Sequence, residues 1–519
     1  NFIEVLKLKR TEIIETVAGK IQGYIENRIS VFKGIPYAEP PIGELRLNDP
    51  LLKESWNGVL EVLEYGPEAP QHISPITPRP YPELDEEKCL TLNIWTPRID
   101  NDRLPVMVWI HGGGFSQGSG SRVDVLNLAK RGNVVLTTIN YRLGAFANLI
   151  LPNVPGNIDM LDQITALKWI KNNIEYFGGD PKNVTIFGES AGGQSVCILM
   201  SMPKAKGLFH KVIAQSGRAM PQGYKFSDRQ KATNWLLKEL NLQPDDLDDI
   251  RNLPIENIIK ASVKVQQKAT ARGIYLAFGP YIDGKNLPKH PLKAIDEGFA
   301  KEIDLVIGTN LEEWKFWHLF NPNFKELEAA KLTHLLKSAL QNIREEENKV
   351  DLVIETYKNS RKENNLPAKP QDIIDAFITD SIFHIPAIKF AEAQCKHHKN
   401  TYMYLFSWQS RFRGGIYGAM HGLDIAFVFK RLLDEDRGFS PKRTKETELL
   451  SAKMMDAWTS FARTGNPNHK LIPKWPQYNV EERATIVFDN DIRIWEDPLK
   501  KEREMWDSMK IWKEFSKNS

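Results

Sequence analysis

The serine at position 190 stands in a motif that can carry out nucleophilic chemistry. Gly188-Glu189-Ser190-Ala191-Gly192 is a G-x-S-x-G sequence between a strand-like run, Val184 to Phe187, and a helix-like run, Gln194 to Met200. A tight turn from strand to helix exposes the serine hydroxyl above a sheet, and the helix N-terminus behind it favours the negative charge of acyl transfer. The motif therefore predicts that Ser190 attacks a carbonyl carbon.

The same pattern occurs a second time, at Gly114-Phe115-Ser116-Gln117-Gly118, so the pattern alone is weak evidence. Ser116 lies in a stretch rich in Gly and Ser, residues 112–121, with no helix-like run directly behind it. We expect Ser116 to be a loop residue. For Ser190 the alternative is an ordinary tight turn without chemistry.

A loop of three glycines comes earlier in the chain. His111-Gly112-Gly113-Gly114-Phe115 directly follows the apolar run Val106 to Ile110. Successive glycines leave backbone N–H groups unobstructed, so that a substrate oxygen can approach them closely. We predict an oxyanion hole made by the N–H groups of Gly113, Gly114 and Ala191. His111 is expected to shape this loop rather than to transfer protons.

The elements that must position these residues alternate between strand and helix. Continuous apolar runs at Pro105–Ile110, Asn133–Ile139 and Ile303–Ile307 predict strands buried on both faces, and Met160–Phe177 has helical spacing. This alternation predicts an α/β fold with a large, mostly parallel central sheet and helices on both faces. Because no repeat or linker is visible, we expect residues 1–519 to form one domain, with helical insertions at about 225–275 and 324–400.

Composition excludes several functional classes. The 519 residues include 69 Lys and Arg against 66 Asp and Glu, which gives a net charge of +3 and no footprint for a nucleic-acid partner. The longest apolar runs are far shorter than the roughly 20 residues that span a bilayer. Three cysteines, Cys89, Cys197 and Cys395, form no metal-ligating pattern. We expect reduced thiols, no metal or cofactor, and a cytoplasmic location; the oligomeric state is not predicted.

Several motifs together resemble the type-B carboxylesterase/lipase family, which includes carboxylesterases, para-nitrobenzyl esterases and cholinesterases. The resemblance extends from Phe32–Ala38 to Trp475–Tyr478. The motifs that carry it are the glycine loop, the serine motif, Asn140–Gly144, Asp162-Gln163 and Phe177–Pro181. The resemblance implies an α/β-hydrolase fold and a serine hydrolase that acts on carboxylic esters through an acyl-enzyme.

A serine nucleophile needs a base and an orienting carboxylate, and an α/β-hydrolase supplies them in the order Ser, acid, His. His421 lies in a Gly-flanked segment that resembles the family's catalytic-histidine segment, whereas His384 falls inside a helical pattern and is expected to be a packed or a surface histidine. The resemblance implies that the family's catalytic acid corresponds to Glu313, which follows the predicted strand ending near Ile307. Its neighbour Glu312 remains a rival, and Trp314 follows where many members have Gly.

Departures from the family refine these expectations. Cys89 matches one half of a family disulfide, but Ala69 stands where the other cysteine would fall, so no bridge is expected. The loop 72–85 lacks the Trp that resembles a choline-binding platform, which makes cholinesterase activity unexpected. The resemblance also implies a salt bridge between Arg46 and Glu87.

The substrate expected from these observations is an uncharged, short- to medium-chain ester. A lipase, or a lactone, carbamate or amide hydrolase with the same triad, remains an alternative. A non-catalytic, cholinesterase-like binding protein is a remote one, since the chain keeps Ser190, Glu313 and His421. The C-terminal apolar stripe, which holds Trp506, Met509, Trp512 and Phe515, predicts a helix docked on the core rather than a membrane contact.

Overall fold

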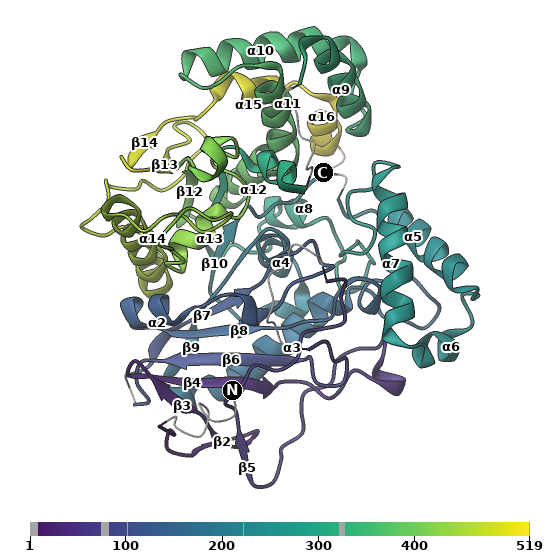
Figure 1. Cartoon of the computed structure of the whole chain (residues 1–519), viewed down its shortest axis with the longest axis vertical. Helices are drawn as coiled ribbons and strands as arrows, with labels where there is room; N and C mark the ends of the chain where they lie inside the picture. The colour runs from purple at the N-terminus through teal and green to yellow at the C-terminus, as the bar shows by residue number, and fades with distance from the viewer. Residues whose placement is uncertain (1–8, 74–82, 101, 222, 321–326, 518–519) are drawn as a thin grey trace. The chain divides into compact units, whose positions relative to one another are not determined.

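The computed structural model describes residues 9–73, 83–100, 102–221, 223–320 and 327–517 (Figure 1). The chain forms two compact units, each built from three separated segments. The first unit consists of residues 1–213, 224–289 and 458–466; the second consists of residues 214–223, 290–457 and 467–519. The units are therefore not consecutive domains, and one domain with insertions stays the prediction made from the sequence.

Strands of the first unit form a sheet in the order β3-β4-β6-β8-β7-β9 (Figure 1). The pairs β7–β8 and β7–β9 are parallel, whereas β3–β4, β4–β6 and β6–β8 are antiparallel. Every residue of β7 is buried, as expected for a strand covered on both faces. The strands of this unit are β1 (Ile14–Thr16), β2 (Gly19–Gln22), β3 (Tyr24–Glu26), β4 (Ile29–Pro36), β5 (Val59–Glu61), β6 (Thr91–Thr96), β7 (Leu104–Ile110), β8 (Val135–Ile139) and β9 (Gly179–Glu189), of which β1, β2 and β5 form a small separate sheet.

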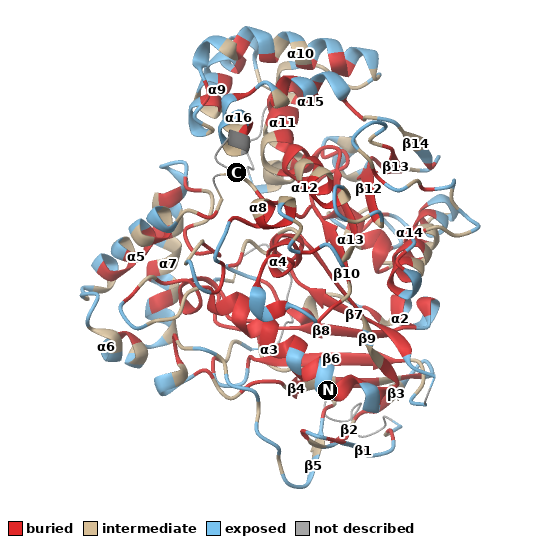
Figure 2. Cartoon of the chain, turned by 180° about the vertical axis from the view of Figure 1, so that it is seen from behind, coloured by how far each residue is buried: buried red, intermediate tan, exposed pale blue. Residues whose placement is uncertain are grey.

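Helices of the first unit differ in how deeply they are buried. The predicted helix 160–177 consists of α3 followed by a short 3₁₀ turn, and Gly178 ends it with a φ of 78°. By contrast, α7 buries only one stripe, Ile258, Ala261, Val265 and Ala269, and Figure 2 shows the outer sides of α5, α6 and α7 exposed. The helices are α2 (Leu126–Gly132), α3 (Ile158–Asn173), α4 (Ala191–Leu199), α5 (Phe226–Leu240), α6 (Leu247–Asn252) and α7 (Ile255–Thr270).

Strands of the second unit are β11 (Asp304–Asn310), β12 (Thr401–Phe406), β13 (Thr485–Phe488) and β14 (Arg493–Trp495), while β10 (Lys211–Gln215) begins in the first unit and ends in the second. The pairs β11–β12 and β12–β13 are parallel, and β13–β14 is antiparallel. The helices are α8 (Pro291–Asp296), α9 (Ala329–Asn342), α10 (Val350–Glu363), α11 (Pro370–Thr379), α12 (Ile385–Cys395), α13 (Leu423–Val428), α14 (Lys445–Thr464, which ends in the first unit), α15 (Lys500–Asp507) and α16 (Lys510–Lys517). A 3₁₀ helix, η6 (Glu313–Phe320), and a π-helical turn, η8 (Asp380–His384), complete the unit.

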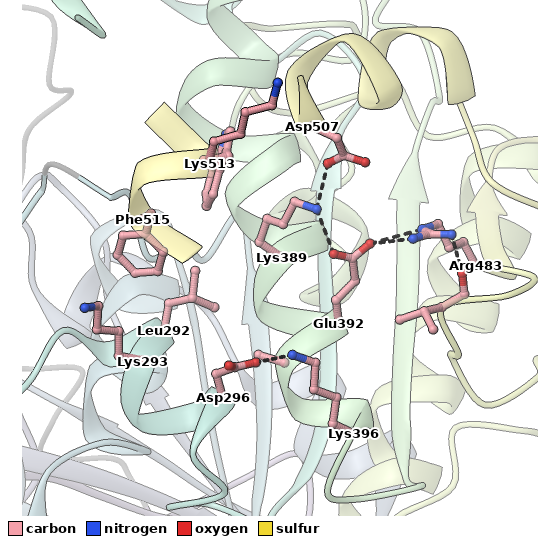
Figure 3. A pocket seen from close by; sticks show the side chains of 13 residues that line it. Leu292, Lys293, Asp296, Lys389, Glu392, Lys396, Arg483, Asp507, Lys513 and Phe515 are labelled. Atoms are coloured by element: carbon pink, nitrogen blue, oxygen red, sulfur yellow. Dashed lines mark hydrogen bonds and ion pairs between the residues drawn. The ribbon is translucent and has the colours of Figure 1, made fainter. Parts of the chain in front are cut away.

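The C-terminal helices α15 and α16 pack within the second unit, and most of the predicted apolar stripe is buried there. Trp506, Met509 and Trp512 are buried. Around the neighbouring pocket, of about 680 Å³, Lys389 of α12 lies between Glu392 and Asp507, at 2.8 and 2.7 Å (Figure 3). The ion pair between Lys389 and Asp507 links α12 to α15, and Trp506 stacks on Phe377 of α11, so both ionic and apolar contacts hold the C-terminal segment.

A buried ion pair near the N-terminus corrects one sequence expectation. Arg46 pairs with Glu86, not with Glu87, and its Nη1 also donates to the backbone oxygens of Arg251 and Leu253. The turn after Asp85 directs the Glu86 side chain inward and leaves Glu87 exposed. The expectation was wrong because two adjacent carboxylates look alike in sequence and differ only in the direction that the turn gives them.

The cysteines are all free thiols, and Cys89 and Cys197 are buried. Ala69, the residue that replaces the second cysteine of the family disulfide, is itself buried. Part of the loop 72–85 on which the choline-platform expectation rests, residues 74–82, lies outside the described residues. Within the described part of the chain, no helix is long and apolar enough to cross a membrane.

Candidate active site

Ser190 sits at the turn between β9 and α4, the strand–turn–helix context that the motif predicts. Its backbone has φ 58° and ψ −119°, a region that residues other than glycine rarely occupy. Such a conformation costs about 1–3 kcal/mol and persists only where the surroundings enforce it. The backbone oxygen of Ser190 accepts a 2.8 Å hydrogen bond from Gln194 N–H, which ties the strained residue to the first turn of α4.

Glycines flank Ser190 because the end of β7 packs directly against the turn. A Cβ added at Gly188 would lie 2.5 Å from the backbone oxygen of Ile110, and one at Gly192 would overlap the same atom. No other residue fits at either position without moving β7 or α4. The two glycines of the motif are therefore required by close packing within the first unit.

The glycine loop lies beside Ser190. A Cβ placed on Gly112 would be 3.1 Å from the Ser190 Cβ, and Gly113 and Gly114 have φ angles of 111° and 63°. The backbone N–H groups of Gly113, Gly114 and Ala191 have no acceptor among the residues that the structure describes. Three donors beside a strained serine are the arrangement that an oxyanion hole needs.

His111 supports this loop, as the sequence predicted. Its ring stacks on Tyr141, with ring centroids 4.3 Å apart, and the Tyr141 hydroxyl donates a 2.8 Å hydrogen bond to the His111 backbone oxygen. Burial lowers the pKa of His111 to about 4, so the ring is neutral near pH 7. Ser116 is a loop residue whose Oγ donates to the Gly113 oxygen at 3.2 Å.

The second unit contains a buried acid–imidazole pair. Glu313 begins η6, three residues after β11 ends, and its Oε2 lies 2.5 Å from Nδ1 of His421. The other oxygen, Oε1, accepts hydrogen bonds from Ser216 Oγ at 2.6 Å and from the Asn310 N–H at 2.8 Å. Glu313 is fully buried and His421 is 5% exposed. The carboxylate is therefore fixed from both sides and holds one nitrogen of the imidazole.

The rival carboxylate, Glu312, has a different role in the structure. Its Oε1 pairs with Lys315 Nζ at 2.6 Å, and its Oε2 accepts the Ala419 N–H at 3.0 Å. Burial acts to raise the pKa of Glu312, but Lys315 and the hydrogen bonds outweigh it and hold the pKa below the usual value. Glu312 thus braces the segment before His421, and it is Glu313 that contacts the imidazole.

Sequence reasoning missed Ser216 and gave Asp424 no definite role. Ser216 follows β10 with a φ of 48°, so a Ser-Gly pair directly after a buried strand was the available signal. Asp424 Oδ2 accepts hydrogen bonds from Gln215 Nε2 at 2.8 Å and from the Tyr404 hydroxyl at 3.1 Å. Asp424 fixes the start of α13, and burial raises its pKa.

His384 is a packed histidine, one of the two roles expected from its helical pattern. Its Nδ1 lies 2.8 Å from Thr309 Oγ1, and burial lowers its pKa to about 4. The aromatic rings of Phe316, Trp317 and Phe383 surround His421. The strand–turn–helix serine, the glycine loop and the Glu–His pair are the parts of a serine hydrolase of the α/β-hydrolase class.

Comparison with known proteins assigns the family. The carboxylesterase family model matches residues 10–506, and the chain belongs to this family, as its motifs predicted. The chain is 37% identical over 505 residues to para-nitrobenzyl esterase of Bacillus subtilis (strain 168), covering 95% of this chain and 98% of the relative. It is 32% identical over 496 residues to phenmedipham hydrolase of Pseudarthrobacter oxydans, with 92% and 95% covered.

Solved structures agree on the fold. A thermophilic PNB esterase matches with a TM-score of 0.83 at 36% identity, over 95% of this chain and 99% of that chain. A carboxylesterase of Geobacillus stearothermophilus also matches with a TM-score of 0.83, at 33% identity, over 96% and 100% of the two chains. The predicted α/β-hydrolase fold is confirmed, and the predicted enzyme class, a serine hydrolase of carboxylic esters, is the class of this family.

Proposed function

We propose that this chain hydrolyses uncharged, short- to medium-chain carboxylic esters by acyl transfer through Ser190, with His421 as general base and Glu313 as its orienting carboxylate. The observation that carries the proposal is the 2.5 Å contact between the buried Glu313 carboxylate and His421 Nδ1. A carboxylate at Nδ1 keeps the proton on that nitrogen and leaves Nε2 as the acceptor that a base needs. A non-catalytic binding protein would have no need of this pair.

In the first half of the reaction, His421 Nε2 removes the Ser190 proton while Oγ attacks the ester carbonyl carbon. The oxygen that becomes negative is stabilised by the N–H groups of Gly113, Gly114 and Ala191 and by the N-terminus of α4. The carbon–oxygen bond to the alcohol then breaks, and the imidazolium gives its proton to the leaving alkoxide. Removal of one oxyanion donor lowers the rate roughly a hundredfold or more, about 3 kcal/mol.

In the second half, water replaces the alcohol. His421 removes a proton from the water, which attacks the acyl carbon, and the carbon–oxygen bond to Ser190 Oγ breaks as the imidazolium returns its proton to the serine. The products are a carboxylic acid and the free enzyme. No cofactor or metal enters this scheme.

Support for uncharged substrates comes from the apolar rings around His421 and from the net charge of +3 on 519 residues, which provides no strong steering of ions. Lipase, lactonase, carbamate hydrolase and amide hydrolase activity use the same chemistry and are alternatives. Because one relative is named phenmedipham hydrolase, phenmedipham belongs among the substrates to be assayed. A cytoplasmic location is supported by the free thiols of Cys89, Cys197 and Cys395.

The experiment is active-site labelling combined with a substrate series. A fluorophosphonate should form one adduct at Ser190, found by peptide mass spectrometry, and p-nitrophenyl esters from acetate to palmitate should show highest turnover at the short to medium lengths. Ser190→Ala should abolish both labelling and turnover. Ser116→Ala, the serine of the second G-x-S-x-G, is the matched control and should keep its label; an adduct at Ser116, or turnover by Ser190→Ala, would refute the assignment.

A further inference from the structure

Aromatic rings enclose the imidazole of His421 within the second unit. The ring of Trp317 stacks on it, with centroids 5.4 Å apart and planes at 29°. Phe383 lies at 4.8 Å and Phe316 at 5.7 Å, both tilted. Because His421 is only 5% exposed, little water is available to solvate the positive charge that a general base acquires. The Glu313 carboxylate at Nδ1 and the π faces of the rings take the place of that water.

A second indole contacts the first. The ring of Trp314 stacks on Trp317, with centroids 4.6 Å apart and planes at 19°. Trp317 therefore stacks both on His421 and on Trp314. Trp317 cannot tilt freely relative to the imidazole, because a change in its orientation would also disturb its stacking contact with Trp314.

Three polar contacts fix the helix that carries the two indoles. On η6, Lys315 Nζ lies 3.6 Å from Asp372, His318 Nε2 lies 2.9 Å from Asp375, and the Trp314 N–H donates to Thr379 Oγ1 at 3.1 Å. Positions 372, 375 and 379 share one face of α11, at helical spacings of three and four. One helix face thus clamps η6 in the position that brings its rings to His421.

We propose that Trp317, supported by Trp314, positions the His421 imidazole and stabilises its protonated form by a cation–π interaction. The inference rests on the proposed function, in which His421 carries the proton from Ser190 to the leaving alcohol. A cation within about 6 Å of an indole face is attracted by the ring quadrupole, and Trp is the strongest of the aromatic partners. Both tryptophans are positioning residues, since neither takes part in bond making.

Charged and titratable groups near His421 that the substitutions retain include Glu313 on η6, Asp424 on α13, His384 on η8 and Arg218, whose guanidinium lies 4.5 Å from the Phe383 ring. Burial lowers the pKa of His384 to about 4, so it remains neutral over the working range. A shift in the pH profile of a Trp317 variant therefore reports on the lost ring.

The test compares pH profiles and leaving groups in Trp317→Leu. Its kcat/KM profile should have its acidic limb displaced to lower pH by roughly half to one and a half units, the size of a desolvated cation–π contact. Turnover should fall about tenfold or more for alkyl esters, whose alkoxide needs the imidazolium proton, and clearly less for p-nitrophenyl esters, whose anion leaves unaided. The loss should appear in kcat rather than in KM.

Conservative and matched variants complete the design. Trp317→Phe and Trp314→Phe keep a ring face and should restore most of the rate, whereas Trp314→Ala should lose several-fold in kcat. Trp495→Phe, on β14 and without a ring contact to His421, is the control for the loss of an indole and should behave as the unmodified chain. If Trp317→Leu does not fold, the Trp317→Phe and Trp314→Ala profiles serve instead.

The inference is overturned if folded Trp317 and Trp314 variants, judged by their melting temperatures, keep the original acidic limb and lose equally on both classes of ester. That result would leave the proposed function standing, provided that His421→Ala and Ser190→Ala are inactive. If those two variants retain turnover, the proposed function itself fails. The two failures are therefore distinguishable.

Discussion

The sharpest prediction concerns the two adjacent carboxylates, Glu312 and Glu313. Glu313→Gln keeps the size of the side chain but puts an amide where Oε2 now faces His421 Nδ1 at 2.5 Å. The amide can donate its N–H to Nδ1, which moves the imidazole proton to Nε2 and removes the acceptor that Ser190 needs. It also leaves the imidazolium of the reaction without a buried counter-charge.

Neither effect changes a group that binds the substrate, so kcat should fall by about 10⁴ near pH 7.5 while KM changes little. That fall corresponds to about 5.4 kcal/mol of transition-state stabilisation, at about 1.36 kcal/mol for each factor of ten. The assay is steady-state hydrolysis of a p-nitrophenyl ester, with fluorophosphonate labelling rates measured on the same preparation.

Glu312→Gln is the matched control, because the same substitution one residue earlier removes one of the two carboxylate partners of Lys315 and leaves the contact between Glu313 and His421 in place. It should keep kcat within about tenfold and should instead lower stability, since a buried ion pair loses one member. A Glu313→Gln enzyme within tenfold of the original, or equal losses in kcat for the two variants, would refute the assignment of Glu313.

Two further predictions concern stability. Burial raises the pKa of Glu502 and of Asp380 beside it in the folded chain. Their neutral forms therefore stabilise the fold fully below the unfolded-state pKa of about 4, and this stability is lost as pH rises through the folded-state pKa values. Glu502→Gln should therefore stabilise the chain by about 1 kcal/mol or more at pH 8 relative to pH 5, measured by urea unfolding; an equal change at both pH values would contradict this. Arg46→Ala should cost about 3–5 kcal/mol by leaving Glu86 buried and unpaired, whereas Glu87→Ala, at the exposed neighbour, should be nearly neutral in thermal melts.

Local sterics explain why the serine turn and the glycine loop could be predicted from sequence. Gly188 and Gly192 are required because the Ile110 backbone oxygen leaves no room for a Cβ. Only glycine meets this requirement, so the sequence shows it. Likewise, the sequence of β7 is a continuous apolar run because both faces of the strand are covered. Both constraints restrict the residue types allowed at a position, which is why they are visible in the sequence even though the contacts behind them are distant in the chain.

The sequence by itself determined the family, the α/β fold and the candidate nucleophile, because each depends on residue types at short, fixed spacings. Only the tertiary structure decided which of two adjacent carboxylates contacts His421 and which of two pairs with Arg46. Neighbouring residues in a turn have the same chemistry and differ in direction, and direction is set by distant partners. For Glu313 those partners, Ser216 and His421, lie 97 and 108 residues away in the chain.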